Sequence, residues 1–515
     1  MSDRIKGELG KVARGGVLSL IGLVASAIFA FLARALVGRT FGPVQYGAYS
    51  LTLTVFSIAL VLAMFGLPTG LPRQVSYFFT KNRKRVGELV STTLILVTIT
   101  STLTLAILLP LTERLAGLLT ANPEGRELLK SLLPLVLLGL PFAALMNTLI
   151  AVAQGYKRVR EYVYYGKIGF PLTYLVLAFL AVYVIGSLRS VIIAYVVSYL
   201  IILMMLLRDL RRAGIVPGIS FSRDLVGVIV LFSLPLLTSN IVAMVLTWTD
   251  SLMLGHYLGS GVVGLYTSAS PLARFISMTV MALMTIYTPV VTGFFAEGKL
   301  ELVERFYAIT SKWSVLLTFP LLFLFVEYPE QVIGTLFGPS YTEASKVLVI
   351  LSLGFALVAI AGPLIQTLVT MGKTVDNMKG DIMGAMLNIF LNYTLIQSFG
   401  MIGAAIATFA SYATTTTYKL SVLIRSGIKP YGKRHALLLA DAGVILAIFH
   451  FIKVTGIIQA LVATAVATLL FYGIAVLVGV PEKEDVELIK SAGEKYGVPV
   501  DWLIRILGRT SREEF

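Results

Sequence analysis

The sequence predicts an all-α integral membrane protein with about fourteen transmembrane helices, and three observations support this. The first is composition: of 515 residues, 57% are hydrophobic and 13% are charged, whereas soluble domains carry about 25% charged residues. The second is a series of apolar segments, each close to the roughly 20 residues that cross a bilayer as a helix. The third is an internal repeat that relates two halves of the chain.

The apolar segments follow one another with short polar connections. They lie near residues 16–38, 46–68, 87–110, 129–153, 166–185, 187–207, 225–249, 264–292, 311–328, 344–370, 381–399, 401–423, 436–452 and 455–479. The first six helices form a predicted N-lobe, residues 1–215, and the next six a predicted C-lobe, residues 216–430. Two further helices occupy 431–480, and residues 481–515 are predicted to form an amphipathic tail on the cytoplasmic side.

Both lobes carry the same glycine motif. The first copy is Gly38-x-x-x-Gly42-x-x-x-x-Gly47-x-Tyr49, and the second is Gly255-x-x-x-Gly259-x-x-x-x-Gly264-x-Tyr266. Each matched pair differs by one offset (255 − 38 = 217), which Gly155 and Gly372 also keep. An even number of helices in each copy makes the halves parallel, related by an axis along the membrane normal. Such a repeat in an apolar chain is typical of a transporter built from two related halves.

Lys and Arg concentrate in the loops on one side of the predicted membrane. The densest runs lie at residues 81–85, 156–160, 208–212 and 428–434. The positive-inside rule therefore predicts a multi-pass protein of the cell membrane with both termini in the cytoplasm. The net charge of +15 has the same explanation, and no basic patch interleaved with aromatic residues indicates nucleic-acid binding.

Several classes of protein are excluded by what the sequence lacks. Cysteine is absent and histidine occurs three times, which excludes disulfides and thiolate metal sites and argues against a histidine metal cluster. There is no Walker A motif, so direct drive by ATP is not expected. No catalytic pair of carboxylates or Ser-His-Asp set converges in a loop of adequate size. We therefore expect neither an enzyme nor a bound cofactor or metal.

Three segments resemble a known family. They are LARALVGRTFGPVQYGAYSL (32–51), WTDSLMLGHYLGSGVVGLYTSA (248–269) and FGMIGAAIATFASY (399–412). They are similar to the helix 1–2, helix 7–8 and helix 11–12 regions of polysaccharide-exporting lipid flippases, the Wzx-like branch of the MOP superfamily. The resemblance covers roughly residues 15–425.

The resemblance implies two six-helix lobes around a central cavity that opens alternately to either side of the membrane. The implied cargo is an oligosaccharide on a polyprenyl phosphate or diphosphate. It would move from the cytoplasmic to the outer leaflet for surface polysaccharide or glycoprotein synthesis. The implied partners are this lipid-linked glycan, the bilayer, and glycosyltransferases or a polymerase of the same pathway.

Three alternatives stay open. A lipid II-type flippase is expected to carry more arginines on its first two helices than Arg34 and Arg73. A MATE-like ion-coupled antiporter is expected to carry an acidic N-lobe residue, and the first two helices here have no Asp or Glu. A membrane-embedded glycosyltransferase or polymerase needs an acidic residue in a large outer loop. The longest outer loops, near 111–128 and 328–343, contain no convincing acid–base pair.

Charges inside the spans are candidate sites, because each costs about 2.5–3.5 kcal/mol at a helix centre. Arg274 lies about 15 Å along helix 8 at 1.5 Å per residue, near the midplane. Its guanidinium suits a phosphate or diphosphate; the alternative is an inter-helix ion pair or a carbonyl clamp.

Asp250 lies near the outer end of helix 7 and is interpreted as the only acidic residue well inside helices 1–12, so it is the first candidate for carrying a coupling ion. Arg34 and Asp250 occupy nearly matching positions of the repeat (33 + 217 = 250). We expect them to pair as an outer gate, unless each extends separately to the interface.

Two further sets are candidates for substrate binding. The basic residues Arg73, Lys167 and Lys373 lie at inner helix ends, where they form either a vestibule for an anionic headgroup or part of the positive-inside charge. The mid-span amides are Asn240, Asn388, Asn392 and Gln366. Such amides bind sugar hydroxyls or hold membrane helices together.

Overall fold

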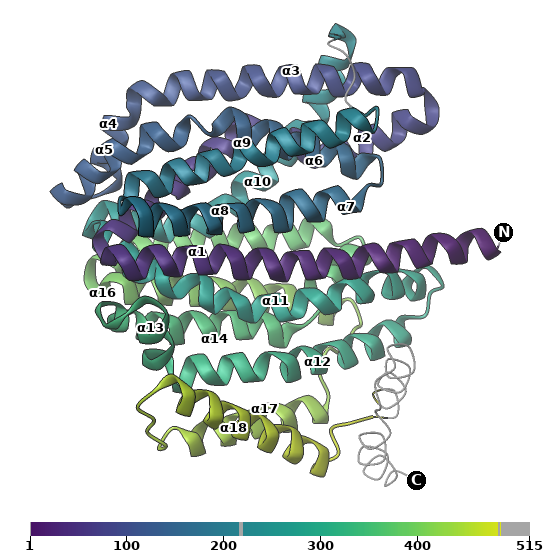
Figure 1. Ribbon diagram of the computed structural model, residues 1–515. Coiled ribbons are helices and arrows are strands. Elements are labelled where there is room, and N and C mark those ends of the chain that lie inside the picture. Colours follow the sequence, from purple (N-terminus) through teal and green to yellow (C-terminus); the bar gives the residue numbers. More distant parts are fainter. Residues whose placement is uncertain (1, 216–219, 483–484, 486–515) are drawn as a thin grey trace. The chain divides into compact units, whose positions relative to one another are not determined.

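The computed structural model describes residues 2–215, 220–482 and 485, and within these ranges every regular element is a helix (Figure 1). In some helical stretches, among them residues 2–17, the backbone alone is described. The predicted all-helical class is confirmed. The amphipathic pattern predicted for the tail falls almost entirely on residues 486–515, which lie outside the described residues.

The N-terminal half is built from long helices joined by short connections. They are α1 (Ser2–Met64), α2 (Leu67–Lys81), α3 (Arg83–Leu108), η1 (Leu109–Leu111), α4 (Thr112–Leu119), α5 (Pro123–Leu137), α6 (Leu140–Gly155), α7 (Val159–Glu161), η2 (Tyr162–Gly169), α8 (Phe170–Leu180), η3 (Ala181–Ile185) and α9 (Leu188–Arg212). The segments η2 and η3 are π-helical and extend α8 at both ends.

The C-terminal half continues in the same manner. Its helices are α10 (Arg223–Leu258), α11 (Ser260–Ala296), α12 (Leu300–Glu327), α13 (Pro329–Phe337), η4 (Pro339–Ala344), α14 (Ser345–Ala361), α15 (Leu364–Thr370), α16 (Thr374–Arg425), α17 (Lys433–Phe449) and α18 (Ile457–Leu477). The last two helices are the pair predicted to lie outside the repeat.

Two helices are interrupted at a glycine. The 63 residues of α1 would reach about 95 Å at 1.5 Å per residue, three times a hydrocarbon core of roughly 30 Å. Gly42 (φ 77°, ψ 174°) breaks α1, and Gly400 (φ 58°, ψ −137°) breaks α16. Positive φ favours glycine, which has no Cβ. Each break falls between two predicted spans, so each of these helices provides two of them.

The number of spans is less definite than the class. The described residues contain eight helical runs long and apolar enough to cross a membrane, or nine if α5 and α6, which meet at 46°, form one broken span. Two runs, Leu18–Lys81 and Thr374–Arg425, each contain two predicted spans. The count of fourteen therefore stays a prediction. Arg73, expected at the end of the second span, instead lies within the separate helix α2.

The chain divides into two compact units. Unit 1 comprises Met1–Ser268, Leu336–Glu343 and Asn388–Ala404, and unit 2 comprises Ala269–Thr335, Ala344–Leu387 and Ala405–Phe515. Unit 1 therefore contains the N-terminal half and α10. It also contains parts of α11, η4 and α16. The predicted lobes follow the repeat instead, and their boundary at residues 215 and 216 stays a prediction.

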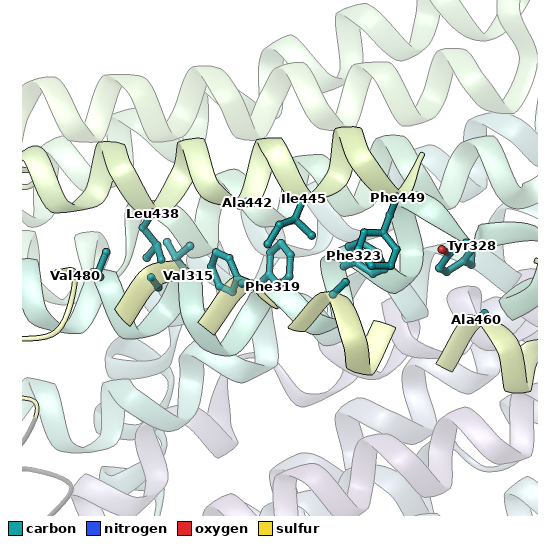
Figure 2. Packing of buried hydrophobic residues seen from close by; sticks show 13 residues of the cluster. Val315, Phe319, Phe323, Tyr328, Leu438, Ala442, Ile445, Phe449, Ala460 and Val480 are labelled. Carbon is teal, nitrogen blue, oxygen red and sulfur yellow. The ribbon is translucent and has the colours of Figure 1, made fainter. Parts of the chain in front are cut away.

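In unit 2, α17 and α18 pack on α12 through aromatic rings (Figure 2). Phe319 stacks on Phe471 with ring centroids 3.9 Å apart, and Phe323 meets Phe449 edge to face at 5.2 Å. In a membrane, van der Waals packing rather than hydrophobic transfer holds helices together. These stacked rings therefore make the last two helices part of the unit 2 core.

Candidate functional site

The two copies of the glycine motif lie against each other in unit 1. A Cβ on Gly47 would lie 1.7 Å from the carbonyl oxygen of Ser260, and a Cβ on Gly264 would lie 2.0 Å from that of Pro43. Pro43 and Ser260 are themselves matched by the offset (43 + 217 = 260). The contact is reciprocal, and only glycine fits at either position.

The repeat is also visible in the backbone and in one hydrogen bond. Gly259, the counterpart of Gly42, has φ 90° and ψ 172°, close to the values of Gly42. Thr267 Oγ1 donates to Ser50 Oγ at 3.1 Å, and these two residues are also counterparts (50 + 217 = 267). Because matched residues contact each other, the pseudo-two-fold axis of the motif passes between them.

Connections from each half cover the motif of the other. The hydroxyl of Tyr341, in η4, donates to the carbonyl of Gly38 at 2.8 Å. The backbone N–H of Ala121, between α4 and α5, donates to the carbonyl of Gly255 at 3.1 Å. Gly38 and Gly255 are counterparts, so the exchange is symmetric. These contacts close the end of the two halves that the charge pattern predicts to face outward.

Next to this closure, Asp250 is buried in a cluster of polar side chains. Its Oδ1 accepts from Nδ2 of Asn392 at 2.7 Å and from Nδ2 of Asn388 at 3.3 Å, and its Oδ2 accepts from the Tyr266 hydroxyl at 2.5 Å. The two asparagines are one helical turn apart on α16 and face the same way. Asp250 is 6% exposed and both amides are 1% exposed or less. The structure thus joins three residues that the sequence singled out separately.

The Asp250 cluster offers the oxygen atoms that hard cations prefer. A carboxylate, a phenol hydroxyl and two amides converge, and Oδ1 of Asn392 accepts no hydrogen bond within the described residues. Amide orientations follow from the surrounding hydrogen bonds, so both asparagines can turn their oxygens inward. The repeat places Ala33 at the position of Asp250 (250 − 217 = 33). The cluster therefore exists in one half only.

Arg34 lies among tyrosines. It is half-buried on α1 and acts electrostatically on four hydroxyls, those of Tyr46, Tyr49, Tyr174 and Tyr195. Tyr49, the counterpart of Tyr266, shares a hydrogen bond of 2.6 Å with Tyr174. Within the described residues Arg34 forms no ion pair, so the structure does not bring it onto Asp250. The outer gate formed by Arg34 and Asp250 stays a prediction for another conformational state.

The remaining predicted basic residues are spread over both units. In unit 1, Arg73 lies 5.1 Å from the ring centroid of Phe232, and Lys167 lies 5.2 Å from that of Tyr162. In unit 2, Arg274 is half-buried on α11 and Lys373 is exposed at the start of α16. Asn240 was also predicted to bind substrate, but its side chain is not among those that the structure describes.

Sequence reasoning missed an ion pair between the two arms of α16. Lys419 Nζ lies 2.7 Å from Asp381 Oδ1 in unit 2, and Lys419 is 2% exposed. The sequence placed Asp381 at the first residue of a span, whereas α16 begins at Thr374, two turns earlier; the interpretation of Asp250 as the sole acidic residue well inside the spans stays a prediction. A hairpin argument could have found the pair, since each residue stands equally far from the turn at Gly400 (400 − 381 = 419 − 400 = 19).

A second missed cluster joins α12 to the start of the tail. Lys312, 2% exposed, contacts the carboxylates of Asp485 and, at 3.3 Å, Glu482. The Trp313 indole N–H donates to Asp485 at 2.9 Å, and Arg434 pairs with Glu482. Burial alone raises the pKa of Glu482, but the charges of Lys312 and Arg434 outweigh it and leave that pKa below its usual value. The cluster fixes residues 482 and 485 to unit 2.

Comparisons with known proteins agree on one superfamily. A family model described as polysaccharide biosynthesis protein matches residues 12–295, more than half of the chain, and a second model, MatE, matches residues 235–394.

Two curated relatives are archaeal. The chain is 27% identical over 170 residues to a probable low-salt glycan biosynthesis flippase, Agl15, of Haloferax volcanii, covering 33% of this chain and 36% of that relative. It therefore spans about a third of the length of this relative. It is 22% identical over 425 residues to an uncharacterized membrane protein of Methanocaldococcus jannaschii, covering 78% and 82% of the two chains.

Two solved structures share the fold. One is the lipid II flippase MurJ in an inward closed conformation, with a TM-score of 0.74 and 14% identity over 89% of this chain and 98% of that one. The other is a multidrug resistance MATE family transporter in an inward-facing conformation, with a TM-score of 0.67 and 17% identity over 78% and 95% of the two chains. At these identities the likeness concerns the fold alone.

Proposed function

Because the chain belongs to the polysaccharide biosynthesis protein family, we propose that it is a flippase for lipid-linked glycans. Its substrate is an oligosaccharide on a polyprenyl phosphate or diphosphate, and it moves from the cytoplasmic to the outer leaflet. The probable glycan flippase among the relatives supports this substrate class. No catalytic role is proposed, and the protein acts in the cell membrane with both termini in the cytoplasm.

The reciprocal glycine contact carries the mechanism. It closes one end of the repeat with two close backbone approaches and the Thr267–Ser50 hydrogen bond, and the hydrogen bonds of Tyr341 and Ala121 cover it. Interactions of this kind can be broken and remade, since a net hydrogen bond contributes only about 1 kcal/mol. The halves, residues 1–215 and 216–430, therefore separate at this end to release the glycan outside and meet again to accept the next one inside.

The predicted basic residues receive the anionic headgroup in this proposal. Arg73, Lys167 and Lys373 gather it at the inner side, and Arg274 and Arg34 bind the phosphate during passage, with the amide of Asn240 contacting sugar hydroxyls. An inside-negative potential assists outward movement of negative charge by about 2.3 kcal/mol per charge per 100 mV.

The Asp250 cluster is proposed as the site for a coupling cation, either a proton or a hard metal ion. A buried carboxylate that binds a cation changes its net charge, and Asn388 and Asn392 would rearrange with it. Both asparagines belong to the segment of α16 grouped with unit 1, beside the glycine contact. A cation bound at the Asp250 cluster is therefore able to shift the equilibrium between the closed and open states of the glycine contact.

A second candidate function is ion-coupled export of small molecules. The MatE model covers residues 235–394, which include Asp250 and Asn392. One experiment separates the two candidates: purified protein in liposomes, offered either a fluorescent lipid-linked oligosaccharide or a cationic dye, with and without Na⁺ and H⁺ gradients. We expect movement of the glycolipid. Movement of the dye alone would replace the proposal with the second candidate.

A further inference from the structure

Unit 2 contains a cavity that the proposed roles do not use. Its volume is about 220 Å³, and it lies between α11, the junction of α14 with α15, and both arms of α16. Ligand pockets for drug-sized molecules measure roughly 300–1,000 Å³, and one water occupies about 30 Å³ of the liquid. The cavity therefore fits a single small ring rather than an oligosaccharide.

A broken helix forms one wall of this cavity. The helix α14 ends at Ala361, Gly362 has φ 64°, and α15 starts at Leu364. Two carbonyls freed by the break are capped from α12: Ser311 Oγ donates to Ile360 at 2.8 Å, and the Tyr307 hydroxyl donates to Ala361. Irregular backbone at membrane depth occurs where it is buried in protein or lines a cavity, and broken helices often mark binding sites.

The opposite wall carries the ion pair of Lys419 and Asp381. An ammonium has three N–H donors, and within the described residues Asp381 is the acceptor found for Lys419. Ser277 Oγ, which also lines the cavity, is buried without a hydrogen-bond partner there. The Asp381 side chain is 35% exposed while that of Lys419 is 2% exposed, and a buried ammonium is costly unless its remaining donors are satisfied. The unused donors therefore require water or a polar ligand in the cavity.

Two glycines shape the ion pair from the α16 backbone. A Cβ on Gly380 would lie 3.0 Å from Cε of Lys419, and a Cβ on Gly384 would lie 2.1 Å from Oγ1 of Thr415. Because neither glycine has a side chain, the second arm of α16 can lie close to the first. Lys419 thus packs against the backbone of the first arm, and the hairpin formed by the two arms of α16 determines its position.

The repeat shows that the ion pair of this cavity has no charged equivalent in the other half, since Asp381 corresponds to Tyr164 (381 − 217 = 164). The counterparts of Lys419 and Gln366 are Ile202 and Leu149 (419 − 217 = 202; 366 − 217 = 149), both at most 2% exposed. The N-terminal half fills those positions with apolar core. The C-terminal half instead has a charged pair, an amide and space, which is the pattern of a site added to one copy.

The chemistry of the lining selects a neutral, hydroxylated ring. The ion pair is neutral overall, and it supplies a donor and an acceptor side by side. The amide of Gln366 and the hydroxyls of Thr415 and Thr416 add both kinds of group, while Val280 and Met284 provide an apolar surface. A pyranose matches this arrangement, because its rim carries hydroxyls and its face carries C–H groups. An anion would have to compete with Asp381 for Lys419.

We propose that this cavity binds one neutral sugar ring of the lipid-linked glycan. The inference rests on the proposed function and adds to it a subsite that recognises sugar rather than phosphate. It predicts that the protein distinguishes a glycosylated carrier from the bare polyprenyl diphosphate through unit 2. Since the predicted orientation puts Asp381 near the inner end of α16, the ring enters from the cytoplasmic side.

Transport in liposomes tests the inference with two substrates, a polyprenyl diphosphate bearing a neutral disaccharide and the same lipid without sugar. The variants Gln366→Leu and Thr416→Val each remove a hydrogen-bonding group at nearly constant volume. We expect each to slow the glycosylated lipid about 5- to 10-fold, as loss of roughly 1 kcal/mol implies, and to leave the bare lipid within about 2-fold. Thr417→Val, at the exposed neighbouring position, is the matched control.

A binding measurement keeps this test separate from transport. The chain has no cysteine, so Thr416→Cys introduces a unique thiol in the cavity, whose alkylation by a maleimide can be timed in detergent. The glycosylated lipid should slow alkylation and the bare lipid should not. Equal effects of both lipids, or equal loss of both transport rates in the variants, would overturn the sugar subsite. Failure of the unaltered protein to move either lipid would overturn the proposed function instead.

Discussion

The sharpest consequence of the reciprocal glycine contact concerns Gly47→Ala. The new methyl group would lie 1.7 Å from the Ser260 carbonyl oxygen and 2.6 Å from its carbon, whereas ordinary contact begins near 3.4 Å. The two backbones must therefore separate by about 1.7 Å (3.4 − 1.7). No side-chain rotation relieves the clash, because the atoms that it meets belong to the backbone.

The magnitude follows from two contributions. Overpacking at a tight contact costs about 1–3 kcal/mol, and separation also breaks the hydrogen bond between Thr267 and Ser50, worth about 1 kcal/mol. A total of about 2–4 kcal/mol changes the ratio of closed to open molecules by roughly 30- to 900-fold. Gly47→Ala should therefore populate an outward-open state that the unaltered protein rarely visits.

Accessibility of a single thiol measures this shift. Ser260→Cys is nearly isosteric, its position is fully buried, and the chain contains no other cysteine. A membrane-impermeant maleimide added outside the cell should label it at least 10-fold faster when Gly47→Ala is present. Gly227→Ala, where a Cβ would meet nothing within 4 Å, is the control. Unchanged labelling in Gly47→Ala would refute the idea that this contact closes the outer side.

Four further predictions concern charged groups. Asp250→Asn keeps the size of the side chain but removes its charge and replaces one acceptor oxygen by an amide donor, so the rate of glycolipid movement should lose its dependence on an ion gradient in liposomes; a retained dependence would move the coupling site elsewhere. Arg274→Ala should lower glycolipid transport about 10-fold or more, since a charge-assisted hydrogen bond contributes roughly 1.5–3 kcal/mol, and transport equal to the unaltered protein would exclude Arg274 from binding the phosphate. Lys312→Met leaves the buried Asp485 carboxylate without its ion-pair partner, while Glu482 keeps Arg434, and should destabilise the detergent-solubilised protein by about 3–5 kcal/mol, measured as a lower midpoint of thermal unfolding. Because the pKa of Glu482 is lowered in the folded protein, its contribution is complete above the usual carboxyl pKa and is lost as the pH falls through the lowered value; a thermal midpoint that rises on acidification below about pH 4 would contradict this sign.

The sequence predicted the all-helical membrane class and the positions of most helices, because apolar segments of spanning length are a strong signal. It also predicted the duplicated glycines, whose backbone angles and mutual contact the structure now shows. The break at Gly42 is shorter than expected, because one residue turns the chain where a connection over residues 39–45 was predicted; the break at Gly400 falls at the single residue left between the predicted spans 381–399 and 401–423. Hydropathy marks where apolar residues end, and it does not mark where a helix ends.

The same limitation hid the ion pairs. Lys312 and Asp381 lie at the edge of the predicted spans, yet α12 begins at Leu300 and α16 at Thr374, so both residues lie well within helices. The partners of Lys312 are 170 or more residues away in the sequence, and a single sequence gives no measure of that proximity. Asp250, Asn388 and Asn392 were each identified from their polar character, and only the packing of α16 against α10 joins them.

The central claim is that the repeat-related halves must part at the glycine contact for each glycolipid that crosses. Ser50→Cys with Thr267→Cys tests it most directly, because the oxygens that the two sulfurs would replace lie 3.1 Å apart and disulfide formation needs only a small adjustment. Oxidation in liposomes should stop movement of a fluorescent lipid-linked oligosaccharide, and reduction should restore it, while each single substitution stays active under both conditions. Movement at an undiminished rate through the oxidised, cross-linked protein would contradict the account.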